Sequence, residues 1–148
     1  VDSGKVYIEG KNEDFDDHPS MSAVGVMSRI FIQKNRNEPA LGAVQHLVND
    51  LPEWKAKKID YYYWYYGSLA LFQYDGPEGP MWKRWNGPMV NALVPNQKTG
   101  KDGCANGSWE VEGDRWAFEG GRVYSTAINA LTLEVYYRYA NVFVGSRK

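Results

Sequence analysis

Apolar residues recur at helical spacing along most of the chain. Between positions 20 and 33 they stand three and four residues apart, at Met21, Val24, Met27 and Phe31. This spacing predicts a helix over that range, because it places the four side chains on one face. The segment has few polar positions, which indicates that the helix is buried on most sides.

A second helix is predicted from 39 to 50. Proline is favoured in the first turn of a helix, and Pro39 stands at that position. Leu41, Val44 and Val48 then form one apolar stripe. Polar residues occupy the other side, so we expect this helix to be half exposed.

Six consecutive aromatic residues, 61–66, open the most apolar segment of the chain. Tyrosine and tryptophan favour strands, but the segment continues with Leu69, Ala70 and Leu71, which favour a helix. We therefore predict a third helix from 60 to 74, with Asp60 as its N-cap.

A fourth helix is predicted from 78 to 94, with Gly87 and Pro88 in its middle. Because proline lacks a backbone N–H and collides with the carbonyl four residues earlier, this pair predicts a kink or a break. A glycine-rich stretch from 96 to 121 is predicted to be an irregular loop. A last helix is predicted from 122 to 140.

Three of the predicted helices share a local sequence pattern. Their segments align around a small residue, which is Ala23, Gly67 and Ala127 in turn. Small residues on one face allow neighbouring helices to approach closely. The repeat predicts an array of helical hairpins in which the first, third and fifth helices form an inner layer.

The composition narrows the possible classes of function. The chain has 148 residues and a mass of 16.9 kDa, which suits one domain with a substantial core. Its 17 basic and 18 acidic residues leave a net charge of −1, which argues against a nucleic-acid partner. One cysteine cannot form an internal disulfide, and no apolar stretch is long enough to span a membrane. The chain begins at Val1, and we expect it to be a processed piece of something longer.

The aligned segments resemble the squalene cyclase and prenyltransferase repeat family, and look most like its uncharacterised bacterial members. The resemblance extends from about Pro19 to Tyr139. Three segments carry it: Ser22–Gly25, Tyr63–Gly67 and Gly121–Ala127. The family's repeat consists of an aromatic residue, Leu, three further residues and Gln, and is followed by Gly-x-Trp. Leu93, Gln97, Gly107 and Trp109 match this pattern in part. In the family this Gln caps a helix end and stacks on the Trp.

This resemblance implies an all-α fold, an arc of about five helices arranged as α/α hairpins of the α/α-toroid type. Residues 1–148 would form a single domain, the C-terminal part of a longer toroid. An isolated arc leaves an apolar edge exposed. We therefore expect the remainder of a parent chain, or a protein partner, to cover that edge.

Asp14, Asp16 and Asp17 spell the Asp-x-Asp-Asp pattern with which class II terpene cyclases protonate their substrates. By resemblance, Asp16 would be the proton donor, kept protonated by the neighbouring carboxylates, with His18 as an orienting partner. The alternative is that these residues form a solvated acidic loop in front of the first helix. The sequence leaves both hypotheses open and favours the loop.

No set of residues predicts a metal or another cofactor. His18, His46 and Cys104 lack the spacing of a zinc site, and the sequence around Cys104 is not that of a thioester domain. The acidic residues of the glycine-rich stretch also lack EF-hand spacing, which favours turns over calcium binding. These acidic residues are Asp102, Glu110, Glu112, Asp114 and Glu119.

Aromatic residues make up 15% of the chain. Flat rings suit glycans or prenyl chains, and they equally suit the packing of a core. The candidate binding residues are Tyr62, Tyr63, Tyr66, Trp82, Trp109 and Tyr124. We expect a non-catalytic binding or interaction module for a peptide, a glycan or a lipid. The alternative is a terpene-cyclase-like enzyme that uses Asp16 and is completed by a longer parent chain.

Overall fold

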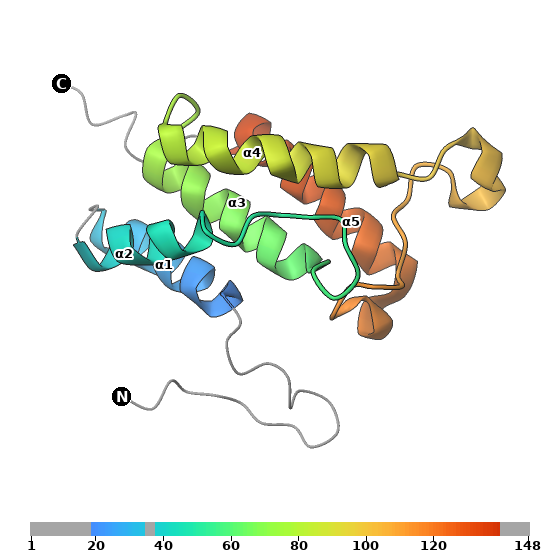
Figure 1. Cartoon of the computed structure of the whole chain (residues 1–148), viewed down its shortest axis with the longest axis horizontal. Helices are drawn as coiled ribbons and strands as arrows, with labels where there is room; N and C mark the ends of the chain where they lie inside the picture. The colour runs from blue at the N-terminus through green and yellow to red at the C-terminus, as the bar shows by residue number, and fades with distance from the viewer. Residues whose placement is uncertain (1–18, 35–37, 140–148) are drawn as a thin grey trace, which may run out of the picture.

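The computed structural model describes residues 19–34 and 38–139 (Figure 1). Its α-helices are α1 (Ser20–Gln33), α2 (Glu38–Leu47), α3 (Tyr61–Asp75), α4 (Pro80–Leu93) and α5 (Ala117–Arg138). Two short 3₁₀ helices, η1 (Val94–Asn96) and η2 (Gly100–Ala105), lie between α4 and α5. The described ranges contain no strand, so the predicted all-α fold is confirmed.

Successive helices run in alternating directions. α1, α3 and α5 run the same way, whereas α2 and α4 run back (Figure 1). α3 lies at the centre, where it contacts α1, α2, α4 and α5, and α1 also contacts α2. The described chain is therefore two helical hairpins, α1–α2 and α3–α4, followed by α5.

α3 is buried on nearly all sides. Its buried residues are Tyr61, Tyr63, Trp64 and the whole stretch 67–74. A helix without a polar face has to be covered by its neighbours, and this packing outweighs the strand propensity of the aromatic run. The predicted N-cap is confirmed, because the Asp60 carboxylate accepts a hydrogen bond of 2.7 Å from the backbone N–H of Tyr63.

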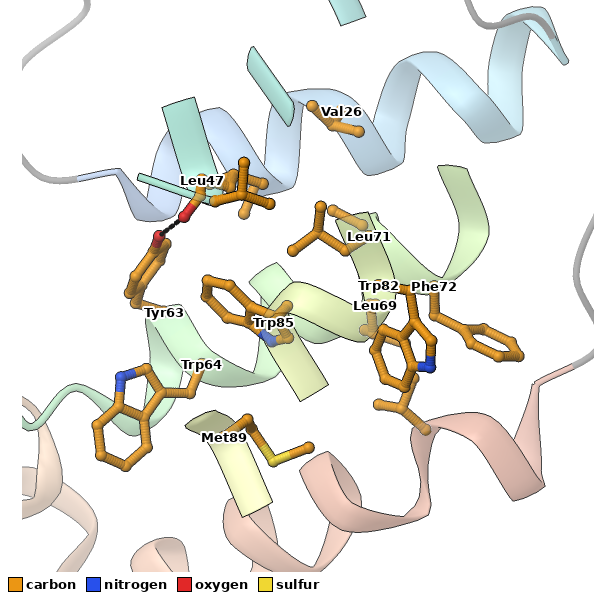
Figure 2. Close-up of a cluster of buried hydrophobic side chains, with 14 of the residues drawn as sticks. Val26, Leu47, Tyr63, Trp64, Leu69, Leu71, Phe72, Trp82, Trp85 and Met89 are labelled. Carbon is orange, nitrogen blue, oxygen red and sulfur yellow. Dashed lines mark hydrogen bonds between the residues drawn. The ribbon is translucent and has the colours of Figure 1, made fainter. Parts of the chain in front are cut away.

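Trp85 of α4 fills the centre of the core against α3 (Figure 2). Its ring meets that of Tyr63 edge-on at 5.4 Å between centroids, and its indole N–H donates to Ser68 Oγ at 2.9 Å. The same ring lies over Gly67, which has no side chain to keep it away. Truncating a buried aromatic side chain of this size costs about 3–5 kcal/mol.

The predicted break into two short helices at Gly87 and Pro88 is wrong. α4 continues from Pro80 to Leu93 with Pro88 inside it. The carbonyl that loses its donor belongs to Arg84, which is exposed, so water can replace the missing backbone N–H. Buried residues on the opposite side of the helix hold it against α3.

Other boundaries differ from the predictions at the helix ends. α2 ends at Leu47 rather than at residue 50, because a tighter turn follows, in which the N–H of Asp50 donates to the carbonyl of Leu47. α5 begins at Ala117, inside the predicted loop. Gly121 interrupts its first turn with a φ of 60°, so the regular helix starts near the predicted residue 122 and ends at Arg138.

The three aligned small residues do not share one environment. Ala23 and Gly67 are buried, and Gly67 does allow a close approach, to Trp85 of α4. Ala127 is exposed on the outer side of α5. The prediction that a small residue brings neighbouring helices together is therefore wrong at Ala127, since no described helix covers that side.

Replacing Gly67 by alanine should destabilise the protein. A Cβ at this position would lie 2.6 Å from the Trp85 ring, so the ring or the helix has to move. Overpacking of this kind costs about 1–3 kcal/mol, which denaturant titration measures directly. Gly25→Ala in α1 is the matched control, because its Cβ meets nothing within 4 Å. The control should gain about 0.5–1 kcal/mol, and equal effects in both variants would contradict the packing argument.

Candidate functional site

Half-buried aromatic rings form a continuous strip along α3 and the two ends of α5. The centroid of Tyr62 lies 4.6 Å from that of Tyr66 and 6.3 Å from that of Trp116. Tyr66 lies 5.1 Å from Tyr65, whose hydroxyl is 3.3 Å from the hydroxyl of Tyr139. We call these five partly exposed residues the aromatic strip.

The helical period separates the strip from the core. Tyr62, Tyr65 and Tyr66 are three and four positions apart, so they share one face of α3. That face turns towards α5, where Trp116 precedes the helix and Tyr139 follows it. The other members of the aromatic run point away from the strip and are buried.

One buried carboxylate ties the starts of α3 and α5 together. Oδ1 of Asp114 accepts a hydrogen bond of 2.6 Å from the N–H of Tyr61, the first residue of α3. Its Oδ2 accepts from the N–H groups of Trp116 and Ala117, at 2.9 and 2.7 Å. Burial raises the pKa of Asp114, and these three N–H donors oppose that rise. The result is that Trp116 is fixed beside Tyr62.

Asp60 lies at the same end of the bundle and is also buried. Its Oδ2 is 4.0 Å from Nε of Arg115, a half-exposed side chain next to Asp114 in sequence. The two carboxylates therefore accept hydrogen bonds from the starts of two helices, and Arg115 faces Asp60.

Tyr124 of α5 lies close to this end of the strip. Burial is the largest cause that raises the pKa of its hydroxyl, followed by the charges of Asp114 and Asp60 and by Tyr62 and Tyr66. The hydroxyl oxygen is buried and has no hydrogen-bond partner in the described part of the chain. Of the candidate binding residues, Tyr62, Tyr66 and Tyr124 are thus brought together.

The other candidate binding residues are buried elsewhere. The Tyr63 hydroxyl lies 3.2 Å from the carbonyl of Leu47 (Figure 2) and 2.9 Å from the carbonyl of Asp50, so its one proton is shared between the two acceptors. The ring of Trp82 packs edge-on against Phe72 at 5.3 Å. These side chains hold helices together and present little surface to a ligand.

The residues that match the family's repeat form hydrogen bonds within the segment after α4 and with the end of that helix. The indole N–H of Trp109 donates to the carbonyl of Leu93, the last residue of α4, at 2.9 Å. Gln97 donates instead to the carbonyl of Gly107 at 2.8 Å. The helix end is therefore held by the Trp, whereas the resemblance assigns the capping role to the Gln.

The candidate acids Asp14, Asp16 and Asp17, and also His18, lie outside the described residues. His46 and Cys104 are exposed. Within the described ranges, no three His, Cys, Asp or Glu side chains gather as a metal site would need. Glu110 pairs with Lys98 and Arg122, which lower its pKa by hydrogen bonds and charge.

The first and last helices carry exposed apolar side chains. Met21 and Ile32 of α1 are 70% and 81% exposed, and Val123 and Tyr137 of α5 are 82% and 76% exposed. A shallow hollow of about 420 Å³ lies on the outer side of α5, lined by Ser108, Arg122, Val123, Thr126 and Ala127. Among the described helices, none is long and apolar enough to cross a membrane.

Sequence reasoning missed part of this site. Tyr65, Trp116 and Tyr139 are not among the candidate binding residues, and the sequence predicts a turn at Asp114 without a contact to another helix. An Asp that follows a Gly in a loop is typical of a turn in which the carboxylate accepts from the N–H two residues later, and Gly113-Asp114 could have indicated the bond from Trp116. No local sequence pattern predicts that Oδ1 of Asp114 accepts a hydrogen bond from α3.

Comparison with known protein families, curated proteins and solved structures found no match to this chain.

Asp114→Asn should destabilise the protein by about 1–3 kcal/mol, because the amide nitrogen cannot accept a hydrogen bond and would leave buried N–H groups unpaired. Asp102→Asn is the control. Asp102 also accepts a backbone hydrogen bond, from Thr99 at 2.6 Å, but it is exposed on η2. That variant should lose less than about 0.5 kcal/mol. Denaturant titration measures the free energy of unfolding of both variants. Equal decreases in the two variants would show that Asp114 does not join the two helices.

The protein should lose stability steeply in alkali. Burial raises the pKa of Tyr61, Tyr63, Tyr65 and Tyr124. Above about pH 10 the unfolded chain therefore releases phenol protons that the folded chain retains. Each such tyrosine lowers the free energy of unfolding by about 1.4 kcal/mol per pH unit, until its folded pKa is reached.

Tyr124→Phe tests whether a raised tyrosine pKa causes the loss of stability in alkali. It removes one hydroxyl that forms no hydrogen bond in the described part of the chain. At pH 7 the variant should be as stable as the parent or slightly more stable, because a buried unpaired group is removed. In urea titrations above about pH 10 its stability should fall less steeply, by about 1.4 kcal/mol per pH unit. An unchanged alkaline slope would mean that Tyr124 titrates normally in the folded state.

Proposed function

We propose that this chain is a non-catalytic binding module that uses the aromatic strip as its ligand surface. One observation carries the proposal: apart from Asp75 at its end, the residues of α3 that are not buried are Tyr62, Tyr65 and Tyr66, and these are the strip. Large rings held rigidly at a surface provide contact area at low entropic cost. The ligand classes that suit such rings are a peptide, a glycan or a lipid.

The roles of the buried acids support a module without catalysis of its own. Asp114 is occupied by three backbone N–H donors, and Asp60 caps α3. A general acid or base has to reach a substrate proton. These two carboxylates are instead used to start helices.

The architecture belongs to the proposal as well. An arc of the α/α-toroid type, as in the squalene cyclase and prenyltransferase repeat family, is supported by parallel α1, α3 and α5 with α2 and α4 running back. The exposed apolar residues of α1 and α5 suit the two ends of such an arc. The terpene-cyclase alternative depends on Asp16, outside the described residues, and stays a prediction, as does a partner at the apolar edge.

A binding survey of strip variants tests this function. The probes are soluble polysaccharides, phosphatidylcholine vesicles and a random-peptide phage library. The parent should bind at least one of them, and Tyr62→Ala combined with Tyr66→Ala should weaken that binding about tenfold or more, which is 1.4 kcal/mol.

Tyr136→Ala combined with Tyr137→Ala is the matched control. These residues also form an aromatic pair, at 3.9 Å, but on the outer part of α5 and outside the strip. Circular dichroism confirms that each variant is folded. Binding of none of the probes, or equal binding by both double variants, would refute the proposed function.

A further inference from the structure

We infer that the aromatic strip takes an uncharged carbohydrate chain. This inference rests on the proposed function and names the ligand class for the same surface. It is carried by the chemistry of the rings, the pairing of the charges beside them and the way the rings are packed.

The strip combines flat faces with hydroxyl groups. Four of its five rings are phenols, and the fifth, Trp116, has the largest face. A sugar ring likewise has an apolar C–H face and a rim of hydroxyl groups. Tyrosine matches both parts of a sugar, because its ring can stack on the apolar C–H face and its hydroxyl can bond to the hydroxyl rim.

Two phenols of the strip are held in the neutral form by their surroundings. Burial raises the pKa of Tyr62 and of Tyr65, and for both the adjacent tyrosines add to the effect. The hydroxyls of Tyr65 and Tyr139, 3.3 Å apart, each keep a lone pair available. The strip therefore offers neutral donors and acceptors, which match sugar hydroxyls.

Cations beside the strip are already paired. Arg115 faces the buried Asp60 carboxylate, and Arg138 donates to Glu134 at 3.1 Å. A phosphate or carboxylate ligand would have to compete with these acids for either guanidinium. The charge arrangement thus favours a neutral ligand over an anionic lipid or an acidic polysaccharide.

The rings form a surface and not a channel. Neighbouring centroids are only 4.6–6.3 Å apart and the rings are inclined to one another, so they pack on each other. Neighbouring rings are in contact, so a ligand has to lie across them. Because the contacts continue from the residue before α5 to the residue after it, they suit an extended ligand with repeating units.

Affinity electrophoresis through gels that contain a neutral polysaccharide tests this inference. Hydroxyethylcellulose, laminarin, xylan and glycogen serve as neutral probes, and alginate as the acidic one. We expect at least one neutral probe to retard the parent, with alginate having no effect. Tyr62→Ala should raise the dissociation constant about tenfold, and Tyr62→Phe, which keeps the ring, should raise it less.

The controls separate this inference from the proposed function. Tyr137→Ala, outside the strip, should be retarded like the parent. If no neutral polysaccharide retards the protein, while vesicles or a peptide bind in a way that Tyr62→Ala abolishes, the carbohydrate inference is overturned and the binding module stands. If retardation survives in Tyr62→Ala and in Tyr66→Ala, the strip is not the site and both proposals fail. Retardation by alginate alone would also overturn the inference.

Discussion

The central constraint on this fold is that α3 has almost no face that tolerates water. From Gly67 to Tyr74 every residue is buried, so all sides of that half of the helix have to be covered by other elements. α1 and α2, α4 and α5 supply that cover, and each contacts α3. The central helix consequently determines the direction and position of its neighbours. Close approach to it depends on single positions such as Gly67, where the Trp85 ring occupies the space of a missing side chain.

A second constraint acts at the ends of the helices. The first N–H groups of a helix have no partner within it, and here the starts of α3 and α5 lie inside the protein. Asp114 resolves both at once by accepting from Tyr61 of α3 and from the residues that open α5. This shared carboxylate sets the relative position of the two helices. It thereby also fixes where Trp116 and the tyrosines of α3 meet, so the candidate site is a consequence of how the helices begin.

The sequence predicted those features that depend on local rules. The range of α1, the cap at Asp60 and the helical state of the aromatic run follow from spacing, capping and propensity. The errors arose where a distant contact or the solvent decides. Pro88 is tolerated because the carbonyl that loses its donor belongs to Arg84, an exposed residue. Ala127 lies open because no described helix covers it. Tyr62 and Tyr66 could be proposed as ligand residues from composition, but their contacts with Trp116 and Tyr139 depend on tertiary packing that no local pattern encodes.

The aromatic strip lies where the core meets the surface. Tyr62, Tyr65 and Tyr66 pack against the core, but part of each ring is left exposed because α3 is incompletely covered there. Rings at such positions contribute less burial than the fully enclosed Trp64 and Trp85. Three tyrosines lie on the one weakly covered face of an otherwise enclosed helix, and their contacts with Trp116 and Tyr139 join α3 to both ends of α5. The strip therefore stabilises the bundle and also forms the surface at which we propose a ligand binds.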